Sequence, residues 1–122
     1  MELKIYELSN NCIAELISPE VEIREIQDAL DMIADAGALG AGSLVMKKEN
    51  LTPDFFDLST GIAGEILQKF STYAFRLAIV GDFSEVSSKS LKDFIYESNK
   101  RKQIVFVESV EDAVEIWFGG RG

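Results

Sequence analysis

Three short and almost uninterrupted apolar runs constrain most strongly how this chain can fold. They occupy residues 43–46, 76–80 and 104–107. Such runs are typical of strands that are buried on both faces of a parallel sheet. The segments between them carry apolar residues at three- and four-residue spacing, which indicates amphipathic helices. We therefore expect strand–helix–strand units that form a largely parallel sheet.

The N-terminal part of the chain predicts a hairpin and then a helix. Residues 2–8 alternate apolar with polar side chains, and residues 12–17 follow as a second strand. Ser18 and Pro19 form a helix-start signal, because a capping hydroxyl precedes a proline that needs no hydrogen bond there. We expect the first helix to begin at this point and to end near Gly37. Later helices are expected from about Thr60, from Ser87 or Ser88, and from Ser109.

The predicted architecture is a single α/β domain over residues 1–122 with a mixed, mostly parallel sheet. An N-terminal hairpin precedes alternating helices and strands. The length suffices for one hydrophobic core, and no linker-like or repeated segment divides the chain. The pattern leaves open whether the helices cover one face of the sheet or both.

The composition excludes several kinds of catalytic and metal site. The chain has no histidine and one cysteine, Cys12. A Ser-His-Asp or Cys-His nucleophile and a structural zinc site are therefore impossible, and Cys12 has no internal disulfide partner. We expect no cofactor and no metal, and we favour a protein that is not an enzyme.

The net charge and the hydropathy of the chain limit the partners and the cellular location that we expect. The net charge is −9, which disfavours nucleic acids and anionic membranes. No apolar run approaches the roughly 18 residues of a membrane span, and the N-terminus lacks the pattern of a signal peptide. We expect a cytoplasmic protein, and we leave its oligomeric state open.

The densest group of polar and small residues lies at the predicted helix start near residue 60. Free N–H groups and the helix dipole favour an anion at such a start. The hydroxyls of Ser59 and Thr60 can cap the helix or accept a phosphoryl group. The two glycines fit either close packing of the helix on the sheet or the close approach of a ligand or partner. The candidate binding surface comprises Asp57, Ser59, Thr60, Gly61, Gly64 and Glu65.

Carboxylates offer a second interpretation of the same segment. Asp54, Asp57 and Glu65 are of the type that binds divalent metals or performs acid–base chemistry, although a solvated, helix-capping set is the simpler explanation. Asp82 follows the run 76–80, at the strand end where open parallel sheets place ligands. A turn-forming aspartate is the alternative there.

Residues 54–70 read Asp-Phe-Phe-Asp-Leu-Ser-Thr-Gly-Ile-Ala-Gly-Glu-Ile-Leu-Gln-Lys-Phe, and Glu97, Ser98 and Asn99 follow later. Over nearly the whole chain this pattern resembles a bacterial family known as domain of unknown function 4180. The resemblance implies a family and no activity.

Residues 59–62 are also similar to the Ser-[Ser/Thr]-Gly-Leu motif of STAS domains, the group of the anti-sigma-factor antagonists. In those domains a partner kinase phosphorylates one hydroxyl and so controls partner binding. The resemblance implies a STAS-like fold, a switch at Ser59 or Thr60, and a kinase or regulatory factor as partner. It departs at Leu58, because the aspartate of the motif directly precedes the hydroxyl pair in that family, whereas here Asp57 stands one residue further back.

These observations favour a non-enzymatic regulatory or protein-binding module. One alternative is a binder of small or lipid-like molecules, with an apolar pocket between the sheet and the helix over residues 87–99. Lys100, Arg101 and Lys102 end that helix, where cations offset the helix dipole. The other alternative is a carboxylate-based enzyme that uses Asp54, Asp57, Glu65 or Asp82.

Overall fold

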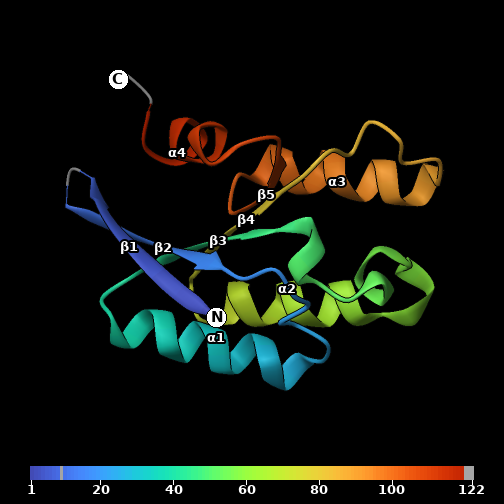
Figure 1. Ribbon diagram of the computed structural model, residues 1–122. Coiled ribbons are helices and arrows are strands. Elements are labelled where there is room, and N and C mark those ends of the chain that lie inside the picture. Colours follow the sequence, from blue (N-terminus) through green and yellow to red (C-terminus); the bar gives the residue numbers. More distant parts are fainter. Residues whose placement is uncertain (9, 120–122) are drawn as a thin grey trace.

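A five-stranded mixed sheet forms the centre of the protein. The computed structural model describes residues 1–8 and 10–119 (Figure 1). The strands lie side by side in chain order; β1 and β2 are antiparallel, and every later pair is parallel. They are β1 (Glu2–Leu8), β2 (Asn11–Ile17), β3 (Ser43–Lys47), β4 (Arg76–Val80) and β5 (Ile104–Val107). The predicted hairpin and parallel sheet are therefore confirmed.

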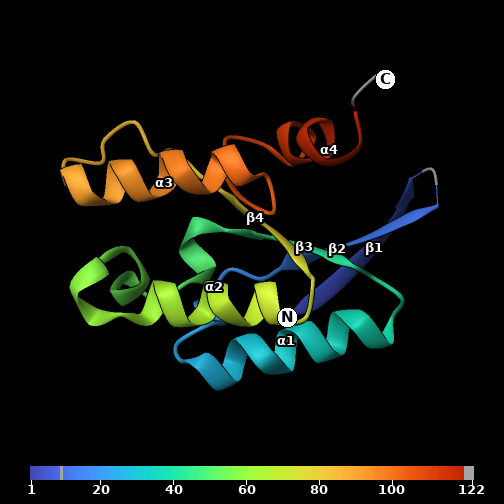
Figure 2. The ribbon, with the colours of Figure 1, turned by 180° about the vertical axis from the view of Figure 1, so that it is seen from behind.

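Helices cover both faces of this sheet, which answers the question that the sequence left open. In Figures 1 and 2, α1 and α2 lie on one side, with α4 on the other. Among the described residues no helix is long and apolar enough to cross a membrane. The α-helices are α1 (Ile26–Ala38), α2 (Ile62–Thr72), α3 (Lys89–Arg101) and α4 (Val110–Phe118), and three short 3₁₀ helices are η1 (Lys48–Asn50), η2 (Pro53–Phe56) and η3 (Leu58–Thr60).

The alternation of side chains along each strand divides the interior into two cores. Leu77 and Ile79 of β4 point into the larger core, which α1 and α2 close with residues such as Ile33 and Phe70. Ala78, between them in the chain, points to the opposite face and into the smaller core under α4. Both faces of β4 are thus buried, as its uninterrupted apolar run predicts.

One predicted helix start is wrong. Helix α1 begins at Ile26 and not at Ser18, and the carboxylate of Asp28 accepts the N–H groups of Arg24 and Glu25 at its start. The backbone N–H groups of Glu22 and Ile23 donate to the carbonyl of Asn50, which keeps the intervening segment out of a helix.

The other helix starts agree with the prediction. Helix α2 begins at Ile62, and the hydroxyl of Ser88 caps α3 by accepting the N–H of Leu91. The hydroxyl of Ser109 caps α4 in the same way through Asp112. Local capping signals therefore locate three of the four α-helices.

The turn η2 places two adjacent phenylalanines differently. Phe55 is fully buried, whereas Phe56 is only partly buried. Their ring centroids lie 4.9 Å apart, and Phe56 also packs on Phe83 at 6.3 Å. Phe55 thus anchors the η2–η3 segment, and with it the start of α2, to the larger core.

Side chains of α3 form hydrogen bonds with backbone groups on the outer side of β5. The side chain of Asn99 accepts the N–H of Phe106 at 2.7 Å and donates to its carbonyl at 3.2 Å. The hydroxyl of Ser98 donates to the carbonyl of Ile104. These two residues of α3 take the place of a neighbouring strand along β5, while β1 ends the sheet on the other side.

Candidate functional site

The six residues predicted as a binding surface lie where the chain enters α2. All of them are exposed: Asp57, Ser59, Thr60, Gly61, Gly64 and Glu65. The chain reaches this point after β3 through η1, η2 and η3, so the segment lies beyond the carboxyl end of a parallel strand. Ligands commonly bind at that edge of open α/β sheets.

Asp57 and Ser59 are bonded to each other. The hydroxyl of Ser59 donates to Oδ1 of Asp57 at 2.6 Å, and the N–H of Ser59 donates to the same oxygen at 3.1 Å. These hydrogen bonds hold the pKa of Asp57 below its usual value, the side-chain bond being the larger cause. A phosphoryl group on Ser59 would stand beside this ionised carboxylate, which opposes it by like-charge repulsion.

The hydroxyl of Thr60 is engaged with the backbone. It faces the carbonyls of Asp54 and Asp57 at 2.8 and 2.9 Å, and it accepts the N–H of Ile62 at 3.2 Å. Thr60 therefore closes the turn and satisfies one of the free N–H groups at the start of α2. This supports capping as its structural role, and phosphorylation of either hydroxyl stays a prediction.

Asp82 repeats the arrangement of Asp57. Its Oδ1 accepts the hydroxyl of Ser84 at 2.6 Å and the N–H of Ser84 at 2.9 Å, and these bonds lower the pKa of Asp82. The turn-forming interpretation of Asp82 is thus confirmed. Within residues 1–8 and 10–119, no group of three or more acidic or cysteine side chains is arranged to hold a metal ion.

The two glycines do not pack closely on the sheet. A Cβ atom added at Gly61 or at Gly64 would meet nothing within 4 Å, so the close-packing explanation is wrong for both. Gly61 has a φ of 78°, a left-handed conformation that L-residues adopt at a cost. Gly64 lies within α2 and has open space beside it.

This difference predicts opposite effects of alanine at the two positions. Gly61→Ala should lower the free energy of unfolding by about 1 kcal/mol because of its positive φ. Gly64→Ala should raise it by about 0.5–1 kcal/mol because alanine favours helix and meets no obstacle. Urea denaturation of both variants measures the two values. Changes of the same sign would contradict the assignment.

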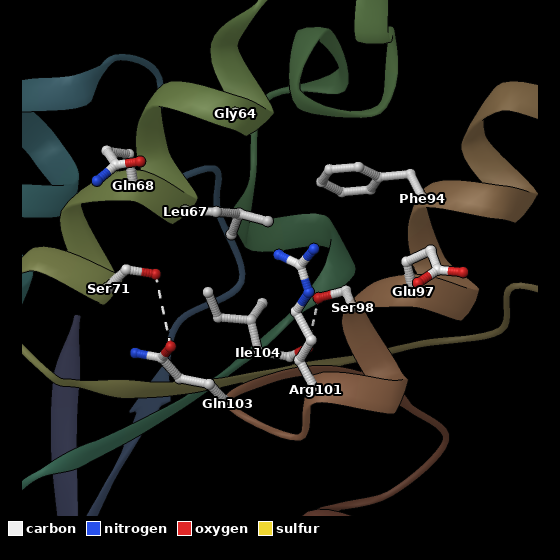
Figure 3. Close-up of a pocket in the computed structure, with 10 residues that line it drawn as sticks. All are labelled: Gly64, Leu67, Gln68, Ser71, Phe94, Glu97, Ser98, Arg101, Gln103 and Ile104. Carbon is white, nitrogen blue, oxygen red and sulfur yellow. Dashed lines mark hydrogen bonds between the residues drawn. The ribbon is translucent and has the colours of Figure 1, made fainter.

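Gly64 opens onto a groove between α2 and α3 with a volume of about 330 Å³ (Figure 3). We call it the α2–α3 groove and define it by Gly64, Leu67 and Ser71 of α2, Phe94 and Arg101 of α3, and Ile104 of β5. Leu67 and Phe94 face each other across it, and the buried Ile104 lies at its base. Its volume lies at the lower end of the range of small-molecule sites.

Arg101 brings a cation into this partly apolar space. Figure 3 shows its guanidinium projecting from α3 into the gap between Leu67 and Phe94. Throughout the described part of the chain, its side chain has no ion-pair or hydrogen-bond partner. Glu97 also lines the groove but is not paired with Arg101. A guanidinium in this position is free to bind a carboxylate or a phosphate.

The sequence identified one residue that lines the groove from the α2 side, Gly64. It also predicted an apolar pocket between the sheet and the helix over residues 87–99. The groove shares α3 and Ile104 with that prediction, but α2 forms its other wall. Leu67, Phe94 and Arg101 were not named as site residues. The spacing of Leu67 and Phe94 marks them as core residues, and Arg101 is explained equally well by the helix dipole.

The fold and the groove define this protein as a mixed-sheet α/β domain with a small-molecule-sized groove between two helices beside the last strand. The chain belongs to the family described as Domain of unknown function (DUF4180), whose model matches residues 8–116. No curated protein and no solved structure matches the chain. The resemblance to STAS domains has no support from these comparisons.

Proposed function

We propose that this protein is a non-enzymatic binding module that takes a small molecule with an apolar portion into the α2–α3 groove. The observation that carries the proposal is the groove itself. The apolar side chains of Leu67, Phe94 and Ile104 lie there around Arg101, which has no partner within residues 1–8 and 10–119. Apolar walls with a small number of polar groups are typical of ligand sites. The open space beside Gly64 supports the same conclusion, since glycine there keeps the groove wide.

The geometry favours this function over the regulatory module. The hydroxyls of Ser59 and Thr60 already serve the turn before α2, and Asp57 opposes a phosphate on Ser59. The enzyme alternative has less support, because Asp57 and Asp82 each hold a neighbouring serine in a turn of their own. The groove, in contrast, combines apolar side chains with a guanidinium that has no partner among the described residues.

Amide chemical shifts test the proposal. ¹⁵N-labelled protein is titrated separately with 1-octanol and with octanoate, which share the alkyl chain and differ in charge. We expect at least one of them to shift the amides of Leu67, Phe94 and Ile104 in a saturable way. Gly64→Leu should abolish these shifts, because its side chain fills open space in the groove.

Glu65→Leu is the matched control, since it adds the same side chain to the next position of α2, outside the lining of the groove. It should bind as the wild type does. Absence of saturable groove shifts with both probes would overturn the proposal. Equal binding by the wild type and by a folded Gly64→Leu variant would do the same.

A further inference from the structure

A second space lies beside the α2–α3 groove. Its volume is about 570 Å³, and Ser71, Arg101 and Gln103 line both spaces. We call the second space the basic hollow and define it by Arg76, Arg101, Lys102 and Trp117. It lies where β4 begins, at the opposite edge of the sheet from the start of α2.

The charge of the basic hollow is opposite to that of the chain. The sequence contains 21 acidic and 12 basic residues, yet among the described residues three cationic ones and no carboxylate line this space. In residues 1–8 and 10–119, the side chains of Arg76, Arg101 and Lys102 make no ion pair. Clustered cations without counter-charges create a local positive potential that attracts anions.

Aromatic residues of α4 contact two of the residues that line the basic hollow. The guanidinium of Arg76 lies over the ring of Phe118 at 5.0 Å, a cation–π contact that leaves its N–H donors available. The indole N–H of Trp117 donates to the carbonyl of Lys102 at 2.9 Å. Helix α4 thus contacts the guanidinium of Arg76 and the backbone at Lys102.

We infer that the ligand of the α2–α3 groove is an amphipathic organic anion, with its apolar part in the groove and its carboxylate or phosphate in the basic hollow. This inference rests on the proposed function and adds the chemical class of the ligand. Arg101 links the two parts, because it lines both the apolar groove and the cationic hollow. A guanidinium binds carboxylates and phosphates through two parallel hydrogen bonds.

Comparing the two eight-carbon probes tests the charge requirement. Octanoate should bind more tightly than 1-octanol by about fivefold or more, as expected for partly exposed charge pairs. Its affinity should fall as sodium chloride is added, whereas that of 1-octanol should not. Octanoate should shift amides both in the groove and around Arg76 and Lys102, and dodecyl phosphate used below its micelle concentration should behave likewise.

Arg101→Gln should reduce the affinity for octanoate by about fivefold and leave 1-octanol binding unchanged. Lys100→Gln is the control, because it removes the same charge from the same helix end. Its ammonium lies over the ring of Tyr96, and it lines neither space. Arg76→Gln provides an independent variant on a different element.

The outcomes separate this inference from the proposed function. Equal affinities for octanoate and 1-octanol in the groove would overturn the inference and leave the function standing. Equal losses in Arg101→Gln and Lys100→Gln would also overturn it, as would octanoate shifts confined to the hollow. No groove shift with either probe would overturn the function and the inference together.

Discussion

Phe55→Ala is expected to lower the free energy of unfolding by about 3–5 kcal/mol, the range for loss of a buried phenylalanine. Phe55 has no exposed surface, and its ring packs on Phe56 and on Phe106 with centroids 4.9 and 6.5 Å away. Domains of this size have a total stability of about 5–15 kcal/mol, so the variant should lose a large part of it. Chemical denaturation followed by circular dichroism measures the change.

Phe56→Ala is the matched control for this prediction. It removes the same ring from the neighbouring position of η2, where the side chain is only partly buried. Its cost should be smaller, because less apolar surface returns to water. If the two variants lost equal stability, η2 would not anchor to the core through Phe55.

Helix α2 should also exchange its amide hydrogens faster in Phe55→Ala, since Phe55 ties the segment that precedes α2 to the core.

Asn50→Ala is expected to lower the free energy of unfolding by about 2–4 kcal/mol, because it leaves buried backbone groups without partners. Asn50 is 1% exposed. Its side chain accepts the N–H of Lys47 at 2.9 Å and donates to the carbonyls of Ser18 and Glu20 at 3.1 and 2.8 Å. One amide thus joins the end of β3 to the segment that follows β2.

Asn50→Asp separates the two kinds of bond that this side chain makes. The carboxylate keeps an acceptor for Lys47 but faces the carbonyls of Ser18 and Glu20 without a hydrogen to donate. We expect it to be at least as destabilising as Asn50→Ala, because a carboxylate beside two carbonyl oxygens is repelled. A stability near that of the wild type would mean that the Lys47 bond alone matters. Thermal and urea unfolding of both variants distinguish these results.

The same asparagine explains why one element could not be predicted from local sequence. Ser18 and Pro19 carry a genuine helix-start signal, yet the helix begins only at Ile26 because the backbone carbonyl of Asn50 accepts the N–H groups of Glu22 and Ile23. That partner is distant in the sequence, and no local pattern reveals it. The buried strands were predictable, because an uninterrupted apolar run is expected of a strand that helices cover on both faces of the sheet. The alternation of strands and helices along the chain already implies that arrangement.

The candidate site also contains one part that the local sequence predicts and one part that it does not. Local signals identified the start of α2 and the capping role of Thr60 there. The α2–α3 groove depends on the separation of two helices and on the direction of one arginine side chain, and both are set by tertiary packing. Leu67, Arg101 and Ile104 come from three elements, so no spacing in the sequence brings them together.

The bonds from α3 to β5 also limit how copies of this protein can associate. Growth of a sheet by addition of strands requires a free edge on each side of every copy. Here Asn99 and Ser98 occupy outer carbonyl and N–H groups of β5, so in the described part of the chain only the edge at β1 can accept another strand. Two copies that pair through β1 leave no free edge between them, and strand-by-strand association therefore stops at a pair instead of continuing into a fibre.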